Sequence, residues 1–373
     1  MKRKTTSEPH HFLPHAENLN EPLGLSWHLY VSGSLKLLTN WAPRLLRTVR
    51  FYIHPAWYNI FLFGVALESF CNIAVQVLEQ KALCQQDPDQ EETEEAPEDQ
   101  AEYDSVLVSS AGDLVSALAN ALGLDFVRLF STFHPLISKY YVSIHYDYNI
   151  FGSYLRLSIQ KESRSLSDRS SAIGCLAEII AGMKSAVTPY TEPLMELFYK
   201  ALSDPEPEVQ SNACFAVGLL IEHSGVDLSP QYLALLAALR PIFDVPPNAS
   251  AARLNAKDNA AGSVSRMIVH NTAAVPLDQV IPVLVAALPL KNDQLENRSV
   301  FRAIFHLFRT NPQSLGPHLD HLLAVFAYVL DPMEPDQISD DARAELIQLI
   351  GYLNTEEPGK VQAAGLGAFL PGA

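Results

Sequence analysis

The stretch DPEPEVQSNACFAVGLLIEHSG, residues 204–225, decides the fold, because its apolar pattern recurs along the chain. Its apolar residues fall on one side of a helix with about 3.6 residues per turn, which predicts a buried stripe. The stripe consists of Ala213, Val217, Leu220 and Ile221. Asp204 is predicted to cap this helix, with Pro205 in its first turn.

The same stripe occurs in four other segments, at intervals of 40 to 47 residues. These segments are 172–180, 260–268, 300–308 and 342–350. A second apolar helix precedes each stripe, and helix pairs with this period are typical of HEAT or armadillo repeats. Two helices per repeat favour HEAT. We therefore predict an all-α fold, a HEAT-repeat α-solenoid in which antiparallel helix pairs form a superhelical stack.

The predicted array covers residues 56–373 in about six to seven repeats, preceded by an atypical and partly disordered segment, 1–55. Within the array, residues 85–104 are predicted to form an acidic disordered loop, since they are strongly charged and poor in apolar residues. The loop either keeps the chain soluble or attracts a basic partner electrostatically. Its central acidic residues are Glu91, Glu92, Glu94, Glu95, Glu98 and Asp99.

Charge and composition exclude several classes of protein. The net charge of −16 disfavours nucleic-acid binding, which requires clustered Lys and Arg. The apolar run 58–78 contains Glu68 and continues into polar sequence, which favours a buried core helix over a membrane span. Four cysteines without a C-x-x-C pair predict reduced thiols in the cytosol or nucleus.

The sequence indicates neither an enzyme nor a cofactor. It contains no P-loop, no G-x-S-x-G motif and no recognisable pair of nucleophile and base. The histidines at 10, 11 and 15 have no carboxylate or cysteine partner nearby, so a polar tail is favoured over a metal site.

A column of small polar residues runs beside the buried stripes. It consists of Ser171, Asn212, Asn259, Ser299 and Asp341. These residues either lie on a solvated flank or form a ladder that hydrogen-bonds an extended peptide, with acidic neighbours that bind its lysines. On the second interpretation the cargo-binding residues are Glu178, Glu208, Asn212, Glu222, Asp258 and Asn259.

The segments DRSSAIGCLAEIIAGM, SNACFAVGLL and KDNAAG resemble the C-terminal HEAT repeats of the importin beta superfamily, the karyopherins. The resemblance covers roughly residues 65 to 370. It implies nuclear import of basic cargo such as histones and ribosomal proteins, contact with Phe-Gly nucleoporins, release by Ran GTPase, and shuttling between cytoplasm and nucleus. By the same resemblance, the main Ran contact lies in an N-terminal half that this chain lacks. The alternative is a HEAT scaffold of another complex, without a transport function.

Overall fold

In the computed structural model, the described residues are 57–85, 97–141, 165–334 and 336–370, and they form helices and turns without a β-strand. The predicted segment 1–55 lies outside them. The α-helices are α2 (Trp57–Leu78), α3 (Pro97–Leu122), α4 (Val127–Ser138), α5 (Leu166–Met183), α6 (Thr191–Ala201), α7 (Pro207–His223), α8 (Tyr232–Phe243), α9 (Ala251–His270), α10 (Leu277–Ala286), α11 (Asn297–Thr310), α12 (Leu319–Leu330), α13 (Asp340–Glu356) and α14 (Pro358–Ala363).

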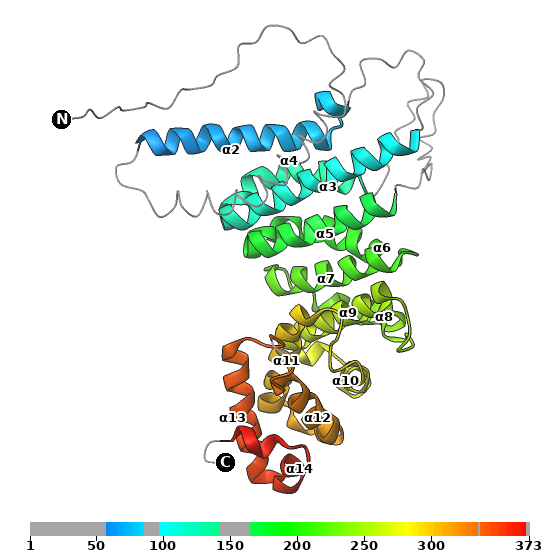
Figure 1. The fold of residues 1–373 in the computed structure, drawn as a ribbon, viewed down its shortest axis with the longest axis vertical. Helices are drawn as coiled ribbons and strands as arrows, with labels where there is room; N and C mark the ends of the chain where they lie inside the picture. The colour runs from blue at the N-terminus through cyan, green and yellow to red at the C-terminus, as the bar shows by residue number, and fades with distance from the viewer. Residues whose placement is uncertain (1–56, 86–96, 142–164, 335, 371–373) are drawn as a thin grey trace, which may run out of the picture.

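The helices of the described residues form six successive pairs, from α2 and α3 to α12 and α13. The second helices contact one another in order, α3 with α5, α5 with α7, α7 with α9, α9 with α11 and α11 with α13. The result is an elongated stack (Figure 1). α3, α5 and α7 run in similar directions in this view, whereas α13 runs in a different direction, so the stack turns after α9. The predicted HEAT-repeat α-solenoid is confirmed.

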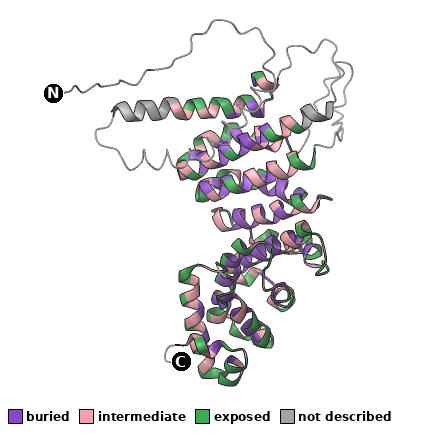
Figure 2. Cartoon of the chain, viewed as in Figure 1, coloured by how far each residue is buried: buried purple, intermediate pink, exposed green. Residues whose placement is uncertain are grey.

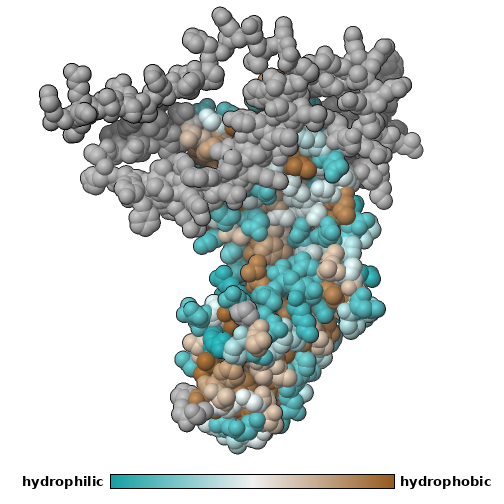
Figure 3. Space-filling model, in the orientation of Figure 1, coloured by the Kyte–Doolittle hydropathy of each residue, from teal (hydrophilic) through white to brown (hydrophobic). Residues whose placement is uncertain are grey.

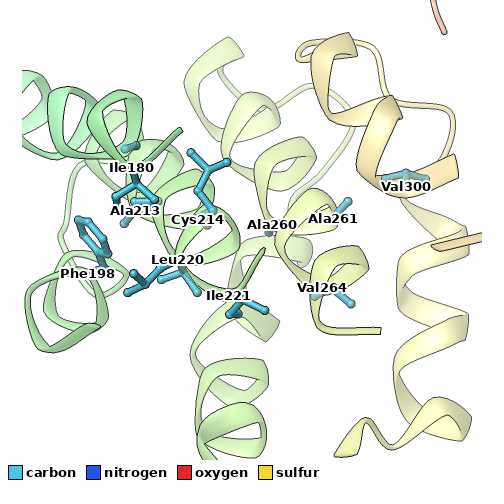
Figure 4. Packing of buried hydrophobic residues seen from close by; sticks show 14 of the residues in the cluster. Ile180, Phe198, Ala213, Cys214, Leu220, Ile221, Ala260, Ala261, Val264 and Val300 are labelled. Carbon is cyan, nitrogen blue, oxygen red and sulfur yellow. The ribbon is translucent and has the colours of Figure 1, made fainter. Parts of the chain in front are cut away.

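The stripe of residues 213–221 forms the core of α7. All four of its residues are at most 1% exposed. Figure 4 shows Phe198 of α6 beside the side of α7 that carries Ala213 and Leu220. Full burial of an aliphatic side chain stabilises the fold by about 1.5–3 kcal/mol, so these contacts between the first and second helix hold each repeat together.

The equivalent stripes of α5, α9 and α11 are buried as well, except that Phe308 is half-buried. The stripe of α13 is less covered, since Ala342 and Leu349 are only partly buried. Figure 2 shows the buried residues concentrated in the middle of the stack. Among the described residues, α13 is followed by the short α14 and a 3₁₀ helix at Leu366–Phe369.

Two predicted boundaries were wrong. α7 begins at Pro207 rather than after Asp204; the Asp204 carboxylate accepts the Glu206 backbone N–H at 3.0 Å and pairs with Arg169 at 3.3 Å. α3 begins at Pro97, so residues 97–104 are helical rather than part of a loop. Proline suits the first position of a helix, and acidic residues in the first turn are stabilised by the helix dipole.

The acidic residues predicted for the loop divide between these regions. Glu98 and Asp99 lie in the first turn of α3. The others lie outside the described residues: Glu91, Glu92, Glu94 and Glu95.

Two stretches of the described chain are long and apolar enough to cross a membrane by length and composition alone, Glu102–Ser138 and Leu166–Ala201. Each combines two helices of the array, and the most apolar window of each is 33% and 56% buried, respectively. The core helices of a soluble protein pass the same test, so these stretches are weak evidence for a span. The run predicted to be a core helix, 58–78, corresponds to α2, whose last turns bury Ala74, Val77 and Leu78.

Candidate functional site

The side of α7 opposite its buried stripe carries a row of residues spaced at helical intervals. They are Glu208, Asn212, Phe215, Leu219 and Glu222, which lie within about 40° of one direction around the helix. Glu208 is exposed, and Glu222 keeps 24% of its side chain exposed. We refer to this side of α7, with the neighbouring surfaces of α5, α9 and α11, as the second-helix face.

The asparagine column connects neighbouring second helices. The Asn212 side-chain amide donates to the carbonyl oxygen of Ser170 at 2.9 Å and to its Oγ at 3.0 Å. One repeat later, the Asn259 amide donates to Ser211 Oγ at 2.9 Å. Ser170 and Ser211 stand directly before the column in successive repeats, so the same bond occurs twice. Each asparagine side chain therefore hydrogen-bonds the second helix of the preceding repeat.

This arrangement is neither of the two predicted from the sequence. Most of the column does not lie on a solvated flank, because Asn259 and Ser299 are buried and Asn212 is partly buried. Asp341, at the end of the column, is exposed. It is also not a free ladder for a peptide, because both amide donors are engaged within the array. A peptide would have to break these inter-repeat bonds in order to accept from either amide.

Asp258 also has an internal role. It is only 1% exposed, and its Oδ2 accepts the backbone N–H groups of Lys291, Asn292 and Asp293 at 3.1, 2.8 and 3.0 Å. These three donors belong to the turn that precedes α11. Asp258 is therefore buried against this turn through its Oδ2, a position that does not favour the predicted pairing with a lysine of a partner.

A network of charged side chains connects three repeats across the second-helix face. The guanidinium of Arg266 on α9 binds Glu296 through two bonds, Nη1 to Oε2 at 2.6 Å and Nη2 to Oε1 at 3.1 Å. Its Nε donates to Glu222 Oε2 at 3.0 Å. The other oxygen of Glu222, Oε1, accepts from Arg302 Nη1 of α11 at 3.0 Å.

The network is buried at one end and solvated at the other. The Arg266 and Glu296 side chains are 9% and 3% exposed, whereas Arg302 is 58% exposed. Burial raises the pKa of Glu296. Burial alone would also raise the pKa of Glu222, but Arg266, with smaller contributions from His223 and Arg302, outweighs it and holds that pKa below its ordinary value. Glu222 and Glu296 share the single buried guanidinium of Arg266, which leaves one net negative charge. A cation on the solvent-exposed side of the network balances this charge.

Two helical glycines make room for the network. A Cβ on Gly262 would lie 1.5 Å from Glu296 Oε2, and a Cβ on Gly218 would lie 3.0 Å from Arg266 Nη1. Gly in a helix costs about 1 kcal/mol relative to Ala, so the glycine in KDNAAG was the available sequence signal for a close contact. Sequence analysis did not identify Arg266 or Arg302, because nothing in their local sequence indicates partners in other repeats.

The remaining acidic residues of the predicted site are solvent-facing. Glu178 on α5 and Glu208 on α7 are exposed, and neither forms an ion pair among the described residues. Partial burial, followed by the nearby charge of Asp113, raises the pKa of Glu178. The surface visible in Figure 3 is largely hydrophilic over the middle of the stack, with scattered hydrophobic patches. Glu178 and Glu208 are therefore the carboxylates of the predicted site that a basic partner can reach directly, whereas both oxygens of Glu222 are bound by arginines of the array.

A separate apolar groove lies between the first helices α8 and α10. Its volume is about 330 Å³, and its lining includes Leu233, Leu236, Phe243, Val280 and Val283. Leu233 is 66% exposed. Nearly all of its lining residues come from α8 and α10, so the groove is distinct from the charged second-helix face.

The stacked helix pairs and the bonds between successive second helices define the chain as a HEAT-repeat protein. The HEAT repeat family profile matches residues 194–224, which cover most of α6 and all of α7. The match falls on the pair whose buried stripe predicted the repeat.

Relatives of known name indicate the kind of HEAT-repeat protein to which the chain is similar. It is 37% identical over 287 residues to "Probable importin subunit beta-4" of Schizosaccharomyces pombe, which is 75% of this chain and 24% of that protein. It is 30% identical to the Importin-4 proteins of Mus musculus and Homo sapiens, over 77% and 80% of this chain and 24% and 25% of theirs. The predicted resemblance is confirmed: the chain is homologous to importin-4 proteins of the importin beta superfamily.

The homology covers only part of these relatives, since the chain spans about a quarter of their length. The relatives are importins by name, which confirms the prediction of a protein other than an enzyme. A solved structure, titled for Kap95p binding to RanGDP, aligns with 90% of this chain and 42% of its own, with a TM-score of 0.44 and 14% identity.

Proposed function

We propose that this chain is part of a nuclear import receptor and that its second-helix face holds a lysine-bearing, extended segment of a basic cargo protein. The observation that carries the proposal is the homology to importins over about three quarters of the chain. Histones and ribosomal proteins are cargoes with the required charge. The receptor would shuttle between cytoplasm and nucleus, and Ran GTPase would act mainly through repeats that this chain does not contain.

The exposed carboxylates suit a peptide that lies along α7. Glu208 and Glu222 are 14 positions apart on one side of the helix, which corresponds to about 21 Å along its axis. An extended chain advances about 3.3 Å per residue, so two lysines about six residues apart would reach both carboxylates. Each exposed pair contributes about 0.2–1 kcal/mol, and Glu178 on α5 adds a third position beside this line.

The acidic segment 85–104 would act before docking. Between Lys81 and Arg128 the chain has twelve acidic and no basic residues. A concentration of one sign of charge raises the association rate of an oppositely charged partner and makes it sensitive to salt. Replacement by glutamine of Glu91, Glu92, Glu94 and Glu95, which lie outside α3, is therefore expected to slow association with basic cargo more than it speeds dissociation.

Among the described residues, the groove between α8 and α10 is a candidate site for Phe-Gly nucleoporins. Its lining is mainly apolar but includes Arg240 and Gln279, and its volume of about 330 Å³ accommodates an aromatic side chain. Leu233 in this lining would lose exposed apolar area on binding. Leu233→Asp is expected to weaken binding of a Phe-Gly repeat peptide without lowering stability, because the side chain is mostly exposed.

A comparison of ligands tests the proposal against a HEAT scaffold without a transport function. The chain is titrated with a lysine-rich histone tail peptide, a Phe-Gly repeat peptide, and two controls, an acidic peptide and a Ser-Gly repeat peptide. Binding of the first two but not of the controls is expected. Failure to bind either of the first two would contradict the proposal and favour a scaffold.

A further inference from the structure

The charged network on the second-helix face contains a cation site that the chain itself fills. Arg266, which is 9% exposed, donates to Oε2 of Glu222 from the buried side of the network. The other oxygen of Glu222, Oε1, accepts from Arg302 at 3.0 Å. Arg302 comes from α11, two repeats after α7. We infer that Arg302 occupies the position of a cargo lysine on Glu222 and must be displaced when a basic segment binds.

The geometry of Glu222 favours a cation in this position. Its Oε2 is fixed by Arg266 Nε at 3.0 Å, so the Oε1 that faces solvent needs no reorganisation before it accepts a second donor. The guanidinium of Arg266 also lies 5.8 Å from the centre of the half-buried Phe215 ring, which further limits its movement. A carboxylate that is already oriented loses little side-chain entropy on binding a lysine.

The charge balance gives the site its preference for a cation. Glu222 and Glu296 carry two negative charges around one buried guanidinium. Arg302 supplies the missing positive charge from the solvent side. The lysine ammonium of a bound segment would restore the same balance, so the exchange of Arg302 for lysine leaves the net charge of the network unchanged.

The exchange is easy because the outer pair is weak. Arg302 is 58% exposed, and ion pairs between exposed side chains contribute little to stability. The inner pair of Arg266 and Glu296 is buried and doubly bonded, so it stays in place. Arg302 thus acts as a weak internal competitor that rejects partners offering only one isolated lysine.

The chain offers a matched control on the same helix. Arg309, also on α11, is 65% exposed and pairs with Glu345 of α13, which is 40% exposed. That pair has no buried arginine beneath it among the described residues. Arg302→Gln and Arg309→Gln therefore remove the same charge and the same kind of exposed pair, but only the first empties the cation site on Glu222.

The inference rests on the proposed function, and the experiment separates the two. The wild-type chain, Arg302→Gln, Arg309→Gln and Glu222→Gln are titrated with the lysine-rich histone tail peptide at physiological salt, after thermal unfolding has shown that each variant is folded. Arg302→Gln is expected to bind about two- to fivefold more tightly than wild type. Arg309→Gln should match wild type, and Glu222→Gln should bind more weakly.

Two other results would overturn the inference, and they differ in what they mean for the proposed function. If the wild type binds and Arg302→Gln gains no more than Arg309→Gln, the competitor role of Arg302 is wrong while the proposed function stands. If no variant binds the peptide, the proposed function fails on this face and the inference fails with it.

Discussion

Gly262→Ala should destabilise the array although alanine is the better helix former. Gly262 lies in the body of α9, where alanine would by itself gain about 1 kcal/mol. The new Cβ would lie 1.5 Å from Glu296 Oε2, so the Glu296 side chain must leave its place. Glu296 is 3% exposed and bound twice by Arg266, and breaking a buried ion pair costs about 3–5 kcal/mol.

The net expectation is a loss of about 2–4 kcal/mol, since the gain in helix propensity offsets only part of the broken pair. Native-state hydrogen exchange of α9 and α11 measures this loss of stability, because exchange reports the local free energy of opening in a repeat array. Gly351→Ala is the control: it lies within α13, and the nearest atom to its Cβ would be Leu370 Cδ2 at 3.9 Å. That substitution should stabilise by up to about 1 kcal/mol.

A double-mutant cycle isolates the cause. In a Glu296→Ala background the obstructing carboxylate is absent, so Gly262→Ala should become neutral or slightly stabilising. An equal loss of stability from Gly262→Ala in both backgrounds would refute the reasoning, because the cost would then arise from backbone or packing rather than from displacement of Glu296.

The other predictions concern the bonds between repeats and the network. Asn212→Ala loses both bonds to Ser170 and should lower the free energy of opening of α5 and α7 by about 0.5–1.5 kcal/mol, measured by hydrogen exchange. Asp258→Ala leaves three backbone N–H groups without their acceptor and should cost at least about 3 kcal/mol in the same assay. The pKa of Glu222 is lowered by folding, so its carboxylate stabilises the fold above its ordinary value of 4.5 and loses this contribution as the pH falls through the lowered pKa. The difference in urea midpoint between wild type and Glu222→Gln should therefore be constant above about pH 5 and shrink below it; a constant difference down to pH 3 would contradict this assignment.

The repeat architecture could be predicted from the sequence because it depends on local spacing. Apolar residues equivalent to Ala213, Val217 and Leu220 occur at the same helical intervals in each repeat. Burial of such an apolar stripe is the dominant favourable contribution to folding. The pattern predicted where the second helices lie and which of their sides is buried. The first residues of the helices were less predictable. Asp204 accepts the backbone N–H of Glu206 in the turn before α7, and the helix itself begins at Pro207.

The candidate site was predictable only in part. Sequence analysis identified Glu178, Glu208 and Glu222 as acidic residues beside the column; the structure leaves the first two exposed and pairs the partly buried Glu222 with two arginines. It could not predict that Asp258 accepts backbone amides 33 to 35 residues away. Spacing within a repeat specifies the side of a helix on which a residue lies, whereas partners in other repeats depend on how the stack turns.

The central claim is that the exposed carboxylates of the second-helix face bind a lysine-bearing segment. It is tested most directly by fluorescence anisotropy titration of a labelled lysine-rich histone tail peptide with wild type and with Glu178→Gln combined with Glu208→Gln, at low and physiological salt. Both residues are exposed and unpaired among the described residues, so the double variant should fold normally. The account predicts that affinity falls about two- to tenfold and depends less steeply on salt. Unchanged affinity and salt dependence would contradict it, and cargo binding would then have to be sought elsewhere on the array.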